Sequence, residues 1–184
     1  MHIQTLALAA CTLAACAAPT NSDGLDVEGQ VVSNGAQAVP AAGQVKVVWN
    51  AYIGEGEQHG QRFLDGEGQS TEGSFALQLE DAPNDLLLQV DGVAVGRLYL
   101  FADAATLPDH LESPEGQPEG WTEPTLDSSL VGIAQDVAIV YVGQDANSET
   151  FPDLPQGYSC ITFSASEPTE QVSCDDVVIE TIEL

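Results

Sequence analysis

Positive charge is nearly absent from this chain of 184 residues. Three Lys and Arg residues stand against 29 Asp and Glu residues, which gives a formal net charge of −26 at pH 7. Nucleic-acid binding is therefore excluded as a function, because the chain has almost no cations with which to displace counterions from phosphates. The same balance disfavours electrostatic adsorption to an anionic membrane surface.

Long apolar runs are also scarce. One run, from Leu6 to Ala15, lies near the beginning of the sequence. It is shorter than the roughly 20 residues of a membrane-spanning helix and is typical of the apolar part of a secretory signal peptide. Hydrophobic residues nevertheless make up 43% of the chain. That content supports a buried core, and we expect residues 26–184 to form a single domain.

The tetrapeptide LAAC at residues 13–16 follows the apolar run and resembles the lipobox of bacterial lipoproteins. The resemblance implies that residues 1–15 are a signal peptide and that Cys16 is diacylated and becomes the mature N-terminus. A second LAAC, at residues 8–11, matches the pattern but would leave a signal of only ten residues. The alternative to lipidation is an ordinary signal peptide cleaved at an A-x-A site near Cys16.

The segment after Cys16 indicates where the protein would reside. Residues 16–25 are small and polar, with Pro and Gly among them, and are expected to form a flexible tether behind the lipid. In lipoproteins of two-membrane bacteria, Ala17 rather than Asp at this position implies the outer membrane. The expected partner is therefore the membrane, through acyl chains on Cys16. Whether the domain faces the periplasm or the cell surface stays open, as does any protein or envelope partner.

Two cysteines remain once the signal is removed and Cys16 carries lipid. Cys160 and Cys174 are 14 residues apart. An even pair in an exported chain predicts a disulfide. A metal site is the weaker interpretation, because the chain has no CxxC motif and no histidine near the pair.

The hydrophobic pattern has a period of two, which predicts strands, and no stretch keeps a helical period with caps at both ends. We expect strands at Val27–Ser33, Val45–Ile53, Ser74–Glu80, Gly92–Ala102, Val131–Val142, Tyr158–Ser164 and Val177–Leu184. Gly92–Ala102 and Val131–Val142 are apolar on both faces, as expected of central strands that are covered on both sides. The predicted fold is all-β: an antiparallel β-sandwich of about seven strands.

Two of these strands carry a family resemblance. The sequence VEGQVVSNG at 27–35 and the sequence GSFALQL at 73–79 resemble the opening strand and a later strand of carboxypeptidase-regulatory-like modules. The resemblance covers about residues 26–90 and implies a transthyretin-like, or prealbumin-like, sandwich. Such modules usually attach, support or bind and seldom catalyse.

Two segments break the strand pattern and are expected to be loops. Gly54–Gly73 is rich in Gly, Glu and Gln, and Asp103–Ser129 contains four prolines and Trp121. A structureless loop of the latter length is usually functional or disordered. Trp121 is interpreted either as an anchor that packs on the sandwich or as an exposed contact, and it is the candidate binding residue.

Acidic residues in both segments are candidate metal ligands. Asp103, Asp109 and Glu112 offer oxygen ligands of the kind that Ca²⁺ prefers, close to His110. The EF-hand order is absent, and a plain surface loop is the competing interpretation. In the first segment Glu55, Glu57 and His59, with Asp65 and Glu67 beyond, offer a weaker site. No cofactor is firmly predicted, and Ca²⁺ is the one candidate.

Catalytic motifs are lacking. No serine lies in G-x-S-x-G, and carboxylate pairs carry no signal in so acidic a chain. Arg97 lies within an apolar strand, where a cation must pair with a carboxylate or donate to a carbonyl, and a structural ion pair is expected. The sequence thus favours a non-enzymatic, lipid-anchored β-sandwich with a structural or binding role. The alternative is a calcium- or metal-dependent binding lipoprotein that uses residues 103–129, and an acidic-site hydrolase is a remote third.

Overall fold

The computed structural model describes residues 24–35, 37–53, 59–89, 91–102, 110–112, 129–146, 151, 153–163 and 170–182. For residues 50–53, 59–62 and 110–112 it describes the backbone alone. Within these ranges, no helix is of the length and apolarity that crossing a membrane would require.

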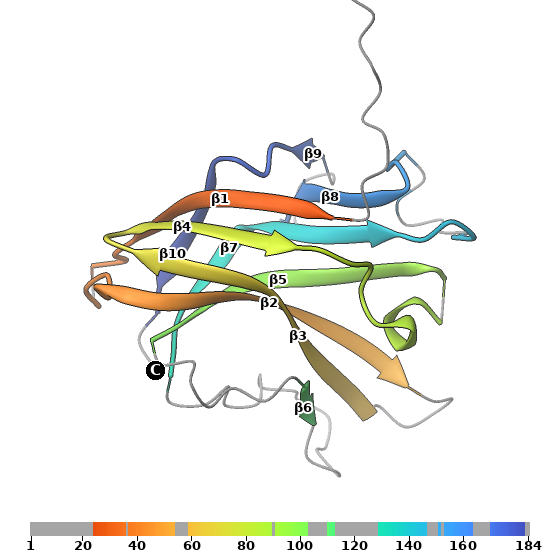
Figure 1. Ribbon diagram of the computed structural model, residues 1–184, viewed down its shortest axis with the longest axis horizontal. Coiled ribbons are helices and arrows are strands. Elements are labelled where there is room, and N and C mark those ends of the chain that lie inside the picture. The colour runs from red at the N-terminus through yellow and green to blue at the C-terminus, as the bar shows by residue number, and fades with distance from the viewer. Residues whose placement is uncertain are drawn as a thin grey trace, which may run out of the picture.

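The described residues form strands and one short 3-10 helix, so the predicted all-β class is confirmed (Figure 1). The strands are β1 (Leu25–Val32), β2 (Ala42–Ile53), β3 (His59–Thr71), β4 (Ser74–Leu79), β5 (Val93–Phe101), β6 (His110–Glu112), β7 (Leu130–Val142), β8 (Gly157–Thr162), β9 (Gln171–Val172) and β10 (Val177–Thr181). The helix η1 (Asp85–Leu88) is capped by Asn84, whose side chain accepts from the Leu86 N–H.

The strands form one continuous sheet in the order β10-β1-β4-β3-β2-β5-β7-β8-β9, with β6 added beside β3. β10 also pairs with β7, which closes the first seven strands of that order into a ring. The fold is therefore a closed barrel and is not clearly the sandwich of two sheets that the sequence predicts. Pairing is antiparallel except between β1 and β10, which run parallel, whereas we expected antiparallel pairing throughout.

A bend in β7 explains how the ring closes. Successive partners of β5 shift from Ala138 to Ile133, so β7 carries extra residues at this point. Such bulges bend a strand and increase its twist. The first part of β7 therefore reaches β10 through Gly132 and Ile133, while the last part pairs with β8. β7 thus pairs with β10 through its first part and with β8 through its last part. The alternation of apolar and polar residues in the sequence does not reveal this arrangement.

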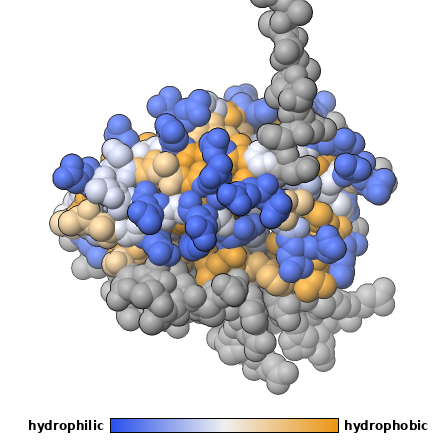
Figure 2. All heavy atoms as spheres, viewed as in Figure 1, coloured by the Kyte–Doolittle hydropathy of each residue, from blue (hydrophilic) through white to orange (hydrophobic). Residues whose placement is uncertain are grey.

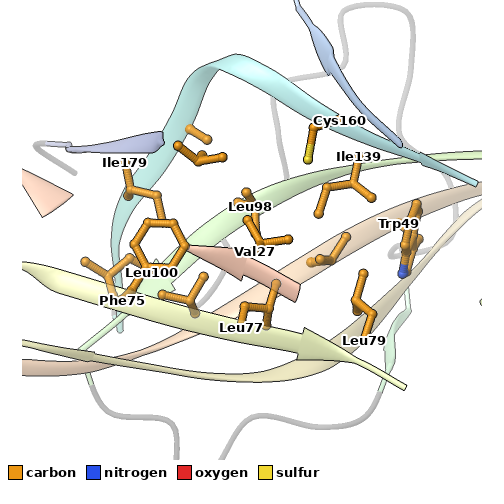
Figure 3. Packing of buried hydrophobic residues seen from close by; sticks show 14 of the residues in the cluster. Val27, Trp49, Phe75, Leu77, Leu79, Leu98, Leu100, Ile139, Cys160 and Ile179 are labelled. Carbon is orange, nitrogen blue, oxygen red and sulfur yellow. The ribbon is translucent and has the colours of Figure 1, made fainter. Parts of the chain in front are cut away.

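Large side chains fill the interior of the ring (Figure 3). Trp49, Leu98, Ile139 and Ile179 are fully buried. Inward side chains alternate with outward ones along each strand, as in β4, where Phe75, Leu77 and Leu79 point inward. The barrel interior is a packed core.

Glycines make room for the largest of these side chains. Trp49 pairs across strands with Gly96, and a Cβ on Gly96 would lie 2.6 Å from the indole Cε3. Leu77 pairs with Gly68, where a Cβ would lie 2.8 Å from Leu77 Cδ1. Large and small residues therefore alternate around the interior, as the limited space inside a closed sheet requires.

The predicted burial of the central strands on both faces is confirmed. β5 and β7 are buried along most of their length. Their outward side chains, with one residue each from β2 and β8, form two further apolar clusters: Val48, Tyr99, Phe101, Leu130 and Ile133 in one, and Val93, Ala138, Val140, Val142 and Ile161 in the other. Phe151 and Leu154 pack against the second cluster.

The expectation of a loop over Gly54–Gly73 is wrong for most of that segment, because His59–Thr71 forms β3. Glycine weakens strands and has no side chain that could show an alternating pattern. In β3, Gly68 and Ser70 occupy buried, inward positions opposite the large side chains of β4. The large side chains of β4 leave room only for small residues at these positions of β3. Because Gly and Ser are not hydrophobic, the alternating pattern that identifies a strand is missing.

The predicted Cys160–Cys174 disulfide is confirmed, with Cα atoms 5.6 Å apart. It joins β8 to the turn before β10, and the Cys174 carbonyl accepts a hydrogen bond of 2.9 Å from the Glu28 N–H in β1. Cys160 belongs to the main core cluster, and Cys174 is partly buried and packs against it. The disulfide therefore fastens β8 towards β1 at the end of the barrel that the β7–β10 pairing leaves open.

Replacing both cysteines by serine should lower the free energy of unfolding by about 3 kcal/mol, because the unfolded chain regains the freedom of the 14-residue loop. Urea denaturation followed by circular dichroism measures this. Wild-type protein unfolded under reducing conditions is the control, and its midpoint should match that of the double variant. Equal midpoints for the variant and the oxidised wild type would contradict the role of the disulfide.

Candidate functional site

The outer face of the barrel carries a β-bulge where β2 meets β3. Val45 pairs with Gly68 and Val47 pairs with Asp65, so Lys46 stands opposite two residues of β3. One of these, Gly66, has a φ of +80°, a conformation that glycine adopts without strain. Bulges of this kind turn neighbouring side chains towards new positions, and here both Lys46 and Asp65 form hydrogen bonds with the backbone of Gly66.

Asp65 is held in place by the bulge and by the core. Its Oδ1 accepts a hydrogen bond of 2.7 Å from the Gly66 N–H. Its Oδ2 accepts one of 3.3 Å from the indole Nε1 of Trp49. Since Trp49 is fully buried, this contact gives the indole N–H a partner and fixes the orientation of the carboxylate.

Lys46 is the one lysine in the sequence. Its Nζ donates a hydrogen bond of 2.7 Å to the Gly66 carbonyl. The ammonium is thereby positioned by backbone, and its other donors stay available because an ammonium carries three N–H groups.

Two grooves meet at Lys46 and Glu67. The smaller has a volume of about 350 Å³ and is lined by Gln44, Lys46, Glu67, Gly68, Gln69 and Ala76. The larger, of about 570 Å³, is lined by Lys46, Leu64, Asp65, Gly66, Glu67, Gln78, Glu80 and Asp81. Together we call them the bulge groove. Figure 2 shows hydrophilic side chains gathered over the face that β4, β3 and β2 present to the viewer in Figure 1.

Tyr158 of β8 connects the barrel interior to the rim of the bulge groove. Its hydroxyl donates a hydrogen bond of 2.7 Å to the Asp81 carbonyl, 77 residues away in sequence. Its ring packs edge-on against Tyr141 at 4.8 Å and lies 6.3 Å from the ring of Trp49. Burial, and to a smaller extent the negative charge of Asp65, raises the pKa of the Tyr158 phenol well above its ordinary value.

Most of the residues predicted as a site are not among those that the structure describes. Cys16, Asp103, Asp109 and Trp121 fall outside the described residues, so their lipidation, calcium-binding and contact roles stay predictions. Glu112 lies in β6, whose backbone pairs with β3. Among the residues that the structure describes, no three His, Cys, Asp or Glu side chains are grouped so as to hold a metal ion.

Among the described residues, no carboxylate forms the ion pair expected for Arg97. Its guanidinium lies 3.8 Å from the centroid of the Phe163 ring. Phe163 is exposed at the end of β8, and Arg97 projects from the outer, apolar face of β5. An aromatic face therefore takes the place of the carboxylate.

The bulge groove was not predicted from the sequence. Asp65-Gly66 reads as a turn signal inside a glycine-rich stretch, and that interpretation conceals a bulge. The one available signal was the isolated Lys46, which alternates with apolar neighbours on a strand and so must face outward. Its partners could not be named without the pairing of β2 with β3.

Comparisons of the chain with protein-family models, with curated proteins and with solved structures find no match. The resemblances to bacterial lipoproteins and to carboxypeptidase-regulatory-like modules stay expectations. The bulge groove is accordingly interpreted from its own residues and geometry.

Replacing Asp65 by Ala should lower the free energy of unfolding by about 1 to 3 kcal/mol, because the buried Trp49 N–H loses its partner. Glu67→Ala, two residues along the same strand and exposed, is the matched control and should change stability by less than about 0.5 kcal/mol. Urea denaturation measures both. Equal effects of the two substitutions would show that Asp65 does not fix the bulge.

Stability should fall at alkaline pH, and Tyr158 should account for part of the fall. The folded state raises the pKa of this phenol above the value of about 10 that it has in the unfolded chain. Unfolding above pH 10 therefore releases a proton, and the stability that Tyr158 contributes below that pH is lost as pH rises towards the folded pKa.

Urea denaturation of wild type and Tyr158→Phe between pH 7 and pH 11 tests this assignment. The free energy of unfolding should decline more steeply for the wild type above pH 10, and the two curves should run parallel below it. Parallel curves over the whole range would contradict the assignment to Tyr158.

Proposed function

We propose that this protein is an exported, lipid-anchored module of the cell envelope that binds or supports and does not catalyse. The observation that carries the proposal is the disulfide between Cys160, a member of the main core cluster, and Cys174, which packs against it. Such bonds persist in oxidising compartments and are rare in the cytosol. An exported chain is what the signal-like residues 1–15 and the LAAC at 13–16 would produce.

The anchor is assigned to Cys16, and the membrane to the outer membrane. Acyl chains on one residue would hold the domain by about 0.8 kcal/mol for each buried methylene group. The tether at 16–25 would leave the barrel free to present its outer surface. A barrel whose interior is filled by large side chains supports a binding or structural role through that surface.

We also propose a more specific fold for the first half of the barrel. We assign residues 26–90 to a transthyretin-like arrangement, in which the motifs at 27–35 and 73–79 form opening and later strands. In support, the first motif lies mainly in β1 and the second mainly in β4, which pair with each other. The modules that this pattern resembles generally attach or bind, in agreement with a non-enzymatic role.

Metabolic labelling with radioactive palmitate, in a bacterium that processes lipoproteins, tests the anchor. Cys16→Ser should abolish label and release the protein from the membrane fraction, because no thiol remains for the thioether. Cys11→Ser is the matched control and should label as the wild type does, since residue 11 would leave with the signal. Label that survives Cys16→Ser and is lost in Cys11→Ser would move the anchor to the other LAAC, and absence of label from all three would refute lipidation.

A further inference from the structure

We propose that the bulge groove binds a neutral, hydroxyl-rich ligand, a segment of a carbohydrate chain. This inference rests on the proposed binding role and names the ligand class for it. Three carboxamides, Gln44, Gln69 and Gln78, line the groove. Each carries both donors and an acceptor, as every sugar hydroxyl does.

Strand register places these groups in a regular array across three strands. Gln44 of β2 pairs directly with Gln69 of β3, and Gln69 pairs with Ala76 of β4. Two residues along β3, Glu67 pairs with Gln78 of β4. Since neighbouring strands lie about 4.8 Å apart, the array extends about 10 Å across the sheet and can meet several hydroxyls of an extended chain.

Small residues form the floor of the array. Ala76 and Gly68 line the smaller groove between the longer side chains of Gln44, Gln69 and Glu67. The volumes of the two grooves, about 350 and 570 Å³, are in the range of small-molecule sites. The depression therefore results from Ala76, which stands at an outward position between Gln69 of β3 and Glu28 of β1.

The charges of the lining favour a neutral ligand over an ionic one. The Lys46 ammonium stands where the two grooves meet and repels a cation. Four carboxylates, those of Asp65, Glu67, Glu80 and Asp81, line the larger groove and repel an anion. A hydroxyl group can donate a hydrogen bond to a carboxylate and accept one from an ammonium. A ligand that carries hydroxyl groups and no net charge can therefore form hydrogen bonds with every polar group of the lining.

Isothermal titration calorimetry of the purified full chain in detergent tests the proposal. The probes are the neutral hexasaccharides of glucose (α- and β-linked), mannose and xylose, with spermine and hexagalacturonate as the charged comparisons. At least one neutral hexasaccharide should bind, and its affinity should be the same in 0.1 M and 0.5 M NaCl because no ion pair is involved.

Two variants locate the binding in the bulge groove. Ala76→Trp fills the floor and Gln69→Ala removes the central carboxamide, and each should weaken binding at least tenfold. Ser74→Trp, an exposed residue two positions along β4, and Gln30→Ala, an exposed residue of β1, are the matched controls and should stay within twofold of the wild type.

Binding of spermine or hexagalacturonate alone would overturn the assignment of a neutral ligand. Failure of all probes to bind, or equal effects of Ala76→Trp and Ser74→Trp, would overturn the site. These results are independent of palmitate labelling, so a failed ligand class and a failed anchor are distinguishable.

Discussion

The steric match between large inward side chains and the glycines opposite them is the constraint on which the barrel depends. Trp49 faces Gly96, Phe75 faces Gly29, Leu77 faces Gly68 and Leu100 faces Gly132, each pair directly across neighbouring strands. A Cβ on Gly29 would lie 2.7 Å from the Phe75 ring, and one on Gly132 would lie 3.0 Å from Ile179 Cγ2. A closed ring cannot widen at one pair without strain on its neighbours, so at these four pairs the bulky residue fits because the residue opposite it is glycine.

The same core shapes the outer surface through one side chain. Trp49 fills the interior, yet its Nε1 reaches Asp65 in the bulge. Asp65 in turn accepts from the Gly66 N–H, and the Gly66 carbonyl accepts from Lys46 on the outer face. A buried indole that needs a hydrogen-bond partner thus fixes the geometry of a surface groove. Because these contacts run from a rigid core to the surface, the groove is preorganised.

The sequence predicts those elements whose side chains alternate visibly. β1, β2, β4, β5, β7, β8 and β10 each overlap a predicted strand, and the cysteine pairing follows from counting. β3 is not recognised because two of its inward positions are Gly68 and Ser70, which leave no hydrophobic alternation in that part of the strand. Closure of the ring could not be predicted from the sequence either, because it depends on a bulge in β7 and on the pairing of β10 with two distant strands. The bulge groove shares this limit: Lys46 and Asp65 are 19 positions apart and meet only through the register of β2 with β3.

The net charge of the molecule and the local chemistry of the bulge groove have different consequences for ligand binding. A charge of −26 opposes anionic partners over long distances and keeps such a protein soluble. At the bulge groove, however, amides and a lysine interrupt the carboxylates, and screening over about 10 Å at 0.1 M salt limits what distant acids contribute. Recognition there depends on hydrogen bonds at contact distance. An acidic surface that disfavours anionic partners is therefore compatible with specific binding of an uncharged ligand on one face of the barrel.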